Sequence, residues 1–334
     1  MADLLKKVKL PENHAPVSVV RAPDLTLPDN NGPSSLSSIN KRLVRSSFEI
    51  SMEEPGSITY QHSILCQTGL PYRNPGDEIR KWERKQGRAT LLIEAGRILN
   101  PKTQDFVKVG LPFGPKPRLI LAHLNSEALK KSSSVIDVGN SLTSFVRRMG
   151  LDTCGKDIKA IKNHLSRLSC STVRLGFVEN NHALQINTQI VSAFDLWFEK
   201  DERQRVFWPS TIKLSEEYFN SLMTHAVPLD ERAVASLSHS AMALDIYAWL
   251  SQRLHRISPK KPQFITWVAV KEQFGWHYGR MNNFKSAFRK TLATVLTQYK
   301  NAKLYQNDKG LTLCHSPAPV KSRLSLVSPH KKLK

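Results

Sequence analysis

The chain has 334 residues, 40% of them hydrophobic, and six tryptophans, which is enough apolar material for packed cores in two or three domains. Its 49 Lys+Arg residues exceed its 28 Asp+Glu residues and give a formal net charge of +21. We therefore expect a polyanionic partner, with nucleic acid favoured over an anionic membrane surface. A membrane-spanning helix needs about 18 consecutive apolar residues; the sequence has no such run, and its first residues, MADLLKK, do not resemble a signal peptide.

The sequence carries no pattern that is typical of a catalytic or metal site. Cys66, Cys154, Cys170 and Cys314 lie far apart and form no C-x-x-C pair, so we expect reduced thiols and no zinc site. A phosphate-binding G-x-x-x-x-G-K-[ST] loop is missing, and the histidines lack metal-ligand spacing. These observations predict neither an enzymatic activity nor a cofactor.

Both ends of the chain are expected to be poorly ordered. Residues 1–62 contain stretches rich in Pro, Asn and Ser without a sustained apolar period, which predicts a mostly disordered N-terminal arm with, at most, a short helix at the basic patch 41–45. Residues 319–334 contain five cations and no acid. They predict a basic disordered tail that adds sequence-independent attraction to DNA.

Residues 63–200 are predicted to form a first domain. A buried strand is expected at 89–95 and a second strand at 106–109, ahead of an apolar helix at 118–129. The elements expected after that helix are a strand at 134–138, a helix that ends before Gly150, a basic helix at 155–168 and a hairpin of strands 171–178 and 183–187. This order of elements is typical of a winged helix-turn-helix.

The basic helix at 155–168 is the centre of this first domain. Its spacing predicts an apolar face formed by Ile158, Ile161, Leu165 and Leu168. Lysines and polar residues occupy the opposite face, which suits a helix that enters a DNA major groove. A solvated lysine-rich face without any partner is the alternative interpretation.

Residues 201–318 are predicted to form a second domain in which the same order of elements recurs. After a strand at 205–214, a helix at 215–222 and a short helix capped by Asp230, the expected elements are a helix at 241–254, a strand at 264–267, a helix at 268–274, a long helix at 282–295 and a hairpin of 302–305 with 311–314. The long helix would bury Phe284, Phe288, Leu292 and Val295. The repeated order predicts an α+β protein with two winged-helix domains in tandem.

The predicted DNA contacts lie on the two basic helices and on the first wing. In the first domain they are Lys156, Lys159, Lys162, Asn163, Arg167 and, on the wing, Arg174; in the second they are Arg280, Asn282, Asn283, Lys285, Arg289 and Lys290. Asn and Arg can bind base edges, whereas Lys mainly neutralises phosphates. Two alternatives stay open: Asn282 or Asn283 caps its helix, and Arg167 pairs with an acid inside the fold.

Several sequence blocks resemble the plasmid-encoded RepA replication initiator family. The blocks are CQTGLPY at 66–72, GLPFGPKPR at 110–118, DLWF at 195–198, FWPST at 207–211, VPLDER at 227–232, ALDIYAWL at 243–250 and QFGW at 273–276. The resemblance covers about residues 65–318 and excludes the arm and the tail. It implies a bacterial, cytoplasmic plasmid initiator whose two winged-helix domains bind repeated origin sequences, but it supplies no established contact residues.

The resemblance and the basic helices predict a DNA-binding initiator that binds double-stranded origin repeats, promotes local opening and recruits host helicase and initiator proteins. A monomer–dimer equilibrium is a further expectation, and a membrane partner is not expected. The alternative is a winged-helix regulator that represses its own gene without initiating replication. A nickase or primase is the third class, but the residues that such chemistry needs are not recognisable in the sequence.

Overall fold

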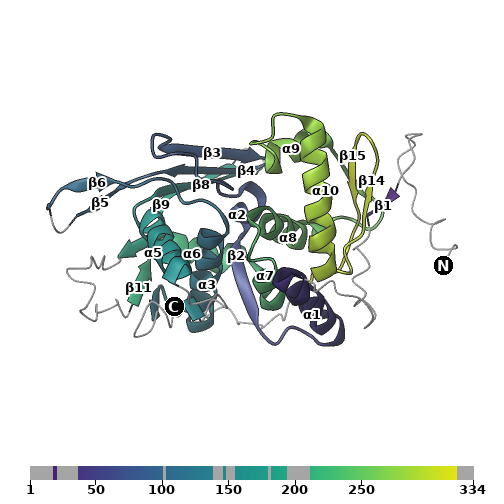
Figure 1. Cartoon of the computed structure of the whole chain (residues 1–334), viewed down its shortest axis with the longest axis horizontal. Coiled ribbons are helices and arrows are strands. Elements are labelled where there is room, and N and C mark those ends of the chain that lie inside the picture. The colour runs from purple at the N-terminus through teal and green to yellow at the C-terminus, as the bar shows by residue number, and fades with distance from the viewer. Residues whose placement is uncertain are drawn as a thin grey trace, which may run out of the picture.

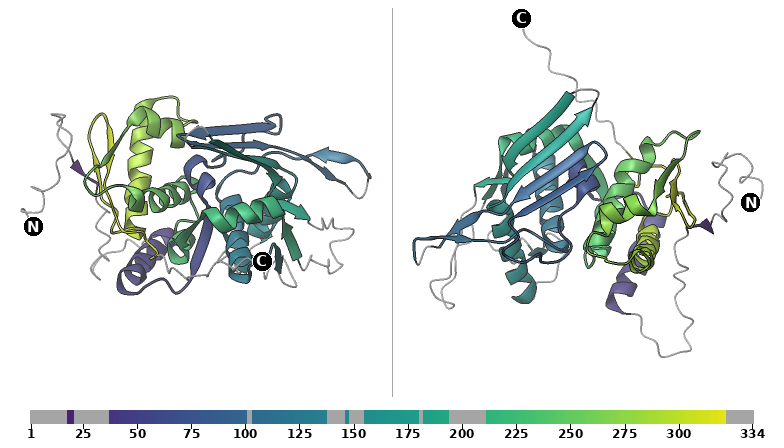
Figure 2. Two further views of the ribbon diagram at one scale, coloured as in Figure 1. Left: turned by 180° about the vertical axis from the view of Figure 1, so that it is seen from behind. Right: turned by 90° about the horizontal axis from the view of Figure 1, so that it is seen from above.

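A computed structural model describes residues 18–20, 37–100, 103–137, 146–147, 155–179, 182–193 and 211–321. Helices and strands build two lobes that lie side by side (Figures 1 and 2), and each lobe has its own hydrophobic core. The predicted α+β class is confirmed. Cys154, most of the helix predicted before Gly150, the residues around Pro209 and the tail beyond Lys321 lie outside the described residues.

The first lobe, residues 63–225, contains a four-stranded antiparallel sheet in the order β3-β4-β8-β9. Its strands are β3 (Lys81–Gln86), β4 (Ala89–Glu94), β8 (Thr172–Glu179) and β9 (His182–Gln189). The helices that share its core are α2 (Ser63–Thr68), α3 (Pro115–Lys131), α5 (Gly155–Ser169) and α6 (Glu216–His225). Alternation places Leu91 and Ile93 of β4 in this core, as expected for a strand with period two.

Five short strands complete the first lobe. β5 (Arg97–Leu99) and β6 (Phe106–Lys108) pair as a ribbon that projects from the body of the protein (Figure 1). β10 (Val191–Ala193), β11 (Thr211–Leu214) and β7 (Val135–Asp137) form a separate three-stranded sheet. The strand predicted at 134–138 therefore exists but pairs with β11, whereas the hairpin β8–β9 joins β4.

The apolar stripe predicted for the basic helix of this lobe is confirmed. Ile161, Leu165 and Leu168 of α5 are buried, and Ile158 packs at the edge of the same core. Residues spaced by three and four share one face of a helix, so the four side chains meet the core together.

The second lobe, residues 18–20, 37–62 and 226–321, is mainly helical. Its helices are α1 (Ser38–Met52), α7 (Glu231–Ser236), α8 (Ala241–Arg253), the 3₁₀ turn η2 (Leu254–Arg256), α9 (Trp267–Phe274) and α10 (Met281–Gln298). Its strands are β1 (Ser18–Val19), β2 (Ile58–His62), β12 (Ala226–Asp230), β13 (Gln263–Thr266), β14 (Leu304–Gln306) and β15 (Gly310–Leu313). β1, β14, β15 and β13 form one antiparallel sheet in that order.

The prediction of a mostly disordered arm over residues 1–62 is wrong for residues 37–62. Helix α1 begins after Ser37, whose hydroxyl accepts a hydrogen bond from the backbone NH of Asn40 at 3.3 Å. Leu43 is buried in the second core, and its carbonyl accepts a hydrogen bond from Gln298 Nε2 at 3.0 Å. The helix is stabilised by residues far along the chain, which local composition does not reveal.

The predicted domain boundary after residue 200 does not separate the two cores. Tyr218 and Leu222 of α6 pack into the core of the first lobe. Pairing with the second lobe starts at β12, which forms an antiparallel ladder with β2. The two cores therefore divide near His225, where α6 ends.

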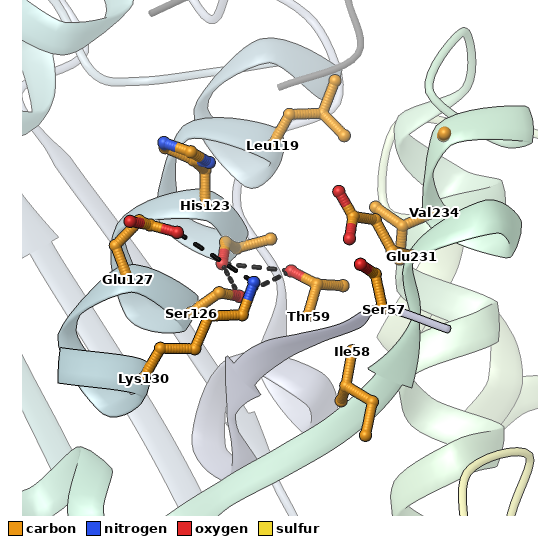
Figure 3. A pocket seen from close by; sticks show the side chains of 12 residues that line it. Ser57, Ile58, Thr59, Leu119, His123, Ser126, Glu127, Lys130, Glu231 and Val234 are labelled. Atoms are coloured by element: carbon orange, nitrogen blue, oxygen red, sulfur yellow. Dashed lines mark hydrogen bonds and ion pairs between the residues drawn. The ribbon is translucent and has the colours of Figure 1, made fainter. Parts of the chain in front are cut away.

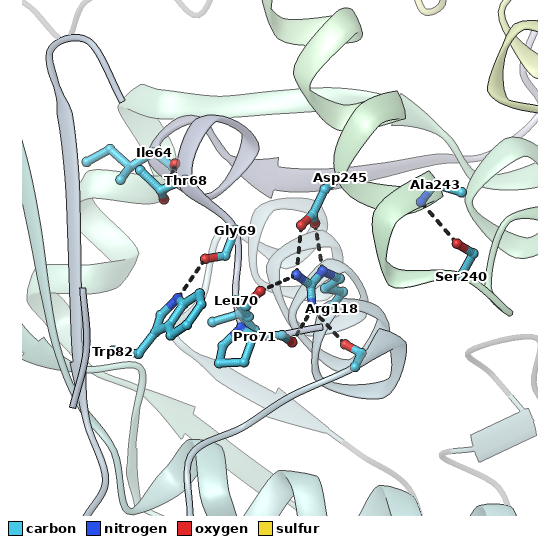
Figure 4. A network of polar contacts seen from close by, with 11 residues as sticks. Ile64, Thr68, Gly69, Leu70, Pro71, Trp82, Arg118, Ser240, Ala243 and Asp245 are labelled. Carbon is cyan, nitrogen blue, oxygen red and sulfur yellow. Dashed lines mark hydrogen bonds and ion pairs between the residues drawn. The ribbon is translucent and has the colours of Figure 1, made fainter. Parts of the chain in front are cut away.

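A buried ion pair joins α3 of the first lobe to α8 of the second (Figure 4). Arg118 of α3 donates from Nε to Asp245 Oδ1 at 2.6 Å and from Nη2 to Asp245 Oδ2 at 2.7 Å. The same guanidinium donates to the carbonyls of Gly114 and Leu70, each at 2.7 Å, and its side chain is 5% exposed. Because a bidentate pair fixes both position and angle, it ties α3 to α8.

A cluster of aromatic rings supports the same junction. Trp82 of β3 and Trp276, which follows α9, make an edge-to-face contact with ring centroids 4.8 Å apart. The Arg84 guanidinium lies over both rings, 4.6 Å from the Trp82 centroid and 5.7 Å from that of Trp276. Such contacts add to the ion pair of Arg118, so the lobes pack as one body.

His62, at the end of β2, makes folding sensitive to acid. Burial and, to a smaller extent, the nearby charge of His225 lower the pKa of His62 from 6.5 to about 3. Below pH 6.5, the ordinary pKa of histidine, His62 is protonated in the unfolded chain but stays neutral in the folded protein. Folding stability is therefore lost as the pH falls. The contribution of His62 is about 1.4 kcal/mol per pH unit between about pH 6 and pH 4.

Urea unfolding at several pH values measures this effect. His62 also caps α2, because its Nδ1 accepts a hydrogen bond from the backbone NH of Ile64 at 3.3 Å, so His62→Asn keeps a capping acceptor and removes the titration. The variant should show a shallower loss of stability in acid than the parent protein. Equal slopes for the two proteins would contradict this role of His62.

Candidate nucleic-acid interface

The long helix α10 has one buried face and one polar face. Phe284, Phe288, Leu292 and Val295 are all 0% exposed, as the spacing predicted. Arg280, Asn282, Asn283, Arg289 and Lys290 are exposed around the other side. The helix contains three cations and no acid between Met281 and Gln298, so its polar face is positively charged.

The asparagines of α10 do not cap the helix. Its N-cap residue is Arg280, and no side-chain hydrogen bond caps this end. Asn282 and Asn283 lie inside the first turn with exposed side chains. The structure therefore removes the capping alternative and leaves both amides available to a partner.

The hairpin β14–β15 is fixed against α10 by cationic side chains. Lys285 Nζ donates to the backbone carbonyl of Asp308 at 3.1 Å, and Arg289 Nε donates to Gln306 Oε1 at 3.1 Å. Both cations also lie over the ring of Trp267, at 5.4 and 5.1 Å from its centroid. Trp267 Nε1 in turn donates to the carbonyl of Asn307 at 2.9 Å. Helix and hairpin therefore form one rigid unit, which we call the α10–wing unit (residues 280–313).

The turn of this hairpin carries a lysine that the sequence reasoning missed. Asn307 Oδ1 accepts hydrogen bonds from the backbone NH groups of Lys309 and Gly310 at 2.9 and 3.0 Å, which holds the turn in shape. Lys309 and Lys303 are exposed at the two ends of the hairpin. The turn predicted between two short strands could have indicated Lys309 as a DNA contact, because a cation at the tip of a wing can reach a phosphate.

Close packing holds α10 against α9. A Cβ atom added to Gly275, the C-cap of α9, would lie 2.3 Å from Cδ2 of the buried Phe284 ring. Gly275→Ala should therefore lower the free energy of unfolding by about 1 to 3 kcal/mol, the usual cost of overpacking. Chemical denaturation measures the loss. Gly279→Ala is the matched control, because nothing lies within 4 Å of the added Cβ there; a loss as large in the control would contradict this explanation.

The predicted contacts of α5 are less uniformly available than those of α10. Lys159 and Asn163 are exposed, and Lys162 is half-buried. Lys156 lies in the first turn of the helix, but its side chain is outside the described part of the structure. Lys116 of α3 forms an ion pair of 2.8 Å with Asp157, so part of the charge at this helix end is compensated.

Arg167 belongs to the fold more than to an open surface. Its Nη1 donates to the Leu111 carbonyl at 3.0 Å and its Nε to Asn163 Oδ1 at 2.8 Å. The guanidinium lies 5.2 Å from the centroid of Phe113, and Nη2 is 3.7 Å from Asp77. With a side chain only 13% exposed, this geometry favours the alternative in which Arg167 pairs with an acid of the fold.

Arg174 is also engaged within the protein. It forms a short ion pair with Glu94, which lies on the neighbouring strand β4. Its charge is therefore compensated where it stands, and it offers less to a phosphate than the exposed cations of the α10–wing unit.

The pocket between α3, β2 and α7 does not suit a polyanion (Figure 3). It has a volume of about 230 Å³, and Glu127 and Glu231 line it from opposite sides. Thr59 Oγ1 and Ser126 Oγ, 2.8 Å apart, hydrogen-bond each other at its floor. Carboxylates repel phosphates, so the α10–wing unit remains the candidate interface.

Fold and surface thus define an α+β protein that presents a basic helix and a basic hairpin as one rigid unit. Residues 111–269 match the family model described as plasmid encoded RepA protein. This match bears out the resemblance to the plasmid-encoded RepA family that the sequence blocks indicated. The matched segment ends within α9, so α10 and its hairpin lie beyond it.

Comparison with solved structures finds distant similarity to domains 2 and 3 of RctB. One crystal structure of these domains has a TM-score of 0.48 and 10% identity, covering 76% of this chain and 98% of the other. A second has a TM-score of 0.42 and 9% identity, covering 80% and 94%. No curated protein matches the chain.

None of the helices in the described part of the chain is both long and apolar enough to cross a membrane. Within the same residues no cluster of three or more His, Cys, Asp or Glu side chains is placed to hold a metal ion.

Proposed function

We propose that the protein is a plasmid replication initiator that binds repeated duplex sequences at an origin. The match of residues 111–269 to the model of the plasmid-encoded RepA family supports the assignment to a plasmid. The observation that carries the DNA-binding step is the α10–wing unit, where exposed cations and two exposed asparagines lie on one preformed surface.

The second lobe carries the proposal of a winged helix. Its elements follow the order α8, β13, α9, α10, β14, β15, and β13 pairs with β15 beside β14. In such a module the second helix of the turn enters the major groove and the hairpin contacts the adjacent backbone. We assign base contacts to Asn282 and Asn283, and phosphate contacts to Arg280, Lys290 and Lys309.

The first lobe would supply a second DNA-binding unit, or reader, formed by α5 and the hairpin β8–β9. Lys159 and Asn163 are exposed on α5. Two readers joined in one chain bind a repeat more tightly than one alone, because the second contact is intramolecular. The buried junction of Arg118 and Asp245 would fix the spacing of the two readers along the duplex.

Initiation by this protein would use binding energy and no covalent chemistry. Bending or untwisting the duplex costs free energy, which the additional contacts offset, and the neighbouring A·T-rich duplex would then open. Recruitment of host replication proteins is the remaining part of the proposal.

Footprinting on the plasmid's own origin tests this function. The expected result is protection of repeated sequences within the origin, at protein concentrations that leave random DNA unprotected. Protection confined to a promoter would overturn the initiator proposal and favour a repressor of transcription.

A further inference from the structure

A cationic groove begins at the junction of the two lobes and continues along the second lobe to β13, whose partner strand β15 belongs to the α10–wing unit. It consists of two adjoining cavities of about 720 and 580 Å³, which share Arg253 and Arg256. The larger cavity lies between α2, the β3–β4 turn and the end of α8; the smaller follows the segment from η2 to β13. We call the two together the inter-lobe groove.

The described lining of the groove contains cations and no acid. Arg88, Arg253, Arg256 and Lys261 line it, and among the residues that the structure describes neither cavity has an Asp or Glu in its wall. This distinguishes it from the pocket beside α3, whose wall contains Glu127 and Glu231. Because arginine keeps its charge in proteins, such a wall attracts an anion.

Arg253 is held in place without a carboxylate. Its Nε donates to Gln263 Oε1 at 3.1 Å, and its guanidinium lies 5.9 Å from the centroid of Trp249. Within the described residues no ion pair joins Arg253 or Arg256 to an acid. A half-buried guanidinium that is already oriented loses little side-chain entropy when it binds an anion.

Aromatic side chains accompany the cations in both cavities. Phe264 of β13 is 42% exposed and lines the smaller cavity, and Phe177 of β8 lines the larger. Cations that follow a sugar-phosphate backbone, together with aromatic faces for bases, are the combination that binds single-stranded nucleic acid.

We propose that the inter-lobe groove binds single-stranded DNA, with phosphates on Arg88, Arg253, Arg256 and Lys261 and a base stacked on Phe264. A duplex keeps its bases paired inside a stiff rod and does not enter a cavity between two lobes. A single strand can turn its bases out toward aromatic rings. The site extends the proposed function, because a strand released by origin opening would be its ligand, but its residues are not those of the α10–wing unit.

Fluorescence anisotropy with the full-length chain tests the proposal. The probes are a labelled oligothymidylate of about 16 nucleotides, an origin-repeat duplex and thymidine monophosphate. Arg256→Glu/Lys261→Glu is compared with Lys41→Glu/Lys108→Glu, a control that makes the same change in net charge at exposed residues of α1 and β6.

The groove variant should bind the oligothymidylate at least about tenfold more weakly. The slope of log K against log salt concentration should become shallower by about 1.4, because each phosphate contact of a single strand contributes about 0.7 to this slope. Phe264→Ala should weaken binding by about 5- to 100-fold, the range for a lost base stack. The control variant should bind the oligothymidylate within twofold of the parent chain, and all variants should bind the duplex within twofold of it.

Three results would overturn the proposal: no binding of the oligothymidylate by the parent protein, equal losses in the groove and control variants, or binding of thymidine monophosphate as tight as that of the oligomer. Failure of duplex binding with intact single-strand binding would instead refute the proposed origin recognition and leave the groove standing.

Discussion

Arg118→Ala should lower the free energy of unfolding by about 3 to 5 kcal/mol, because it leaves the Asp245 carboxylate buried without its partner. Asp245 accepts hydrogen bonds from both Nε and Nη2 of Arg118, and the Asp245 side chain is 12% exposed. The substitution also removes the donors to the Gly114 and Leu70 carbonyls. Urea denaturation followed by tryptophan fluorescence measures the loss through the shift of the midpoint.

The paired variant Arg118→Met/Asp245→Leu separates the cost of an unpaired charge from the worth of the pair itself. Replacing both partners of a buried ion pair with apolar side chains is often neutral or stabilising. We therefore expect the double variant to recover most of the stability that Arg118→Ala loses. A double variant as unstable as the single one would show that packing around Arg118, and not the buried charge, explains the effect.

Arg280→Ala/Lys290→Ala should make the slope of log K against log salt concentration for duplex binding shallower by about 1.8, because each phosphate contact of a duplex contributes about 0.9 to this slope. Both side chains are exposed, and neither belongs to the contacts that fix the hairpin to α10. The loss should be the same for an origin repeat and for a scrambled duplex, since phosphate contacts carry no sequence information. Binding titrations at several salt concentrations measure both quantities.

Lys41→Ala/Lys131→Ala removes the same charge from exposed residues of α1 and α3 and serves as the control. It should leave the salt dependence unchanged. If the α10 variant and this control reduce it equally, the effect comes from net charge, and the assignment of Arg280 and Lys290 to phosphates is refuted.

The elements with a strong apolar period were the ones that the sequence predicted well. Ile161, Leu165 and Leu168 of α5, and the four buried residues of α10, follow helical spacing and are buried. The hairpin β8–β9 was predicted from alternating apolar residues and the hairpin β14–β15 from the turn between its strands, and the structure contains both hairpins. In these segments local pattern and final packing agree, so the pattern was sufficient.

Other elements depend on partners that are distant in sequence. β3, with the sequence KWERKQ, has no apolar alternation and forms because it pairs with β4. Helix α1 buries only Leu43, Ser46 and Ser47, and is held by α7 and α10. Arg118 and Asp245 are 127 residues apart. Single-sequence patterns carry no information about such pairs.

The candidate site was predictable to the same extent. The polar face of α10 followed from its buried face, so its exposed cations and asparagines could be named. The engagement of Arg167 with Leu111, Phe113 and Asp77 could not be seen, because those residues lie in other elements. The inter-lobe groove was missed because only the packing of the lobes brings Arg88 and Phe177 next to Arg253 and Arg256.

Site-specific photocrosslinking tests most directly whether the α10–wing unit contacts duplex DNA. A photoreactive residue placed at Lys290 should crosslink to the labelled origin repeat, and one placed at Lys41 should not. Crosslinking from position 41 without crosslinking from position 290 would contradict the account, because the exposed face of α10 would then lie away from the DNA.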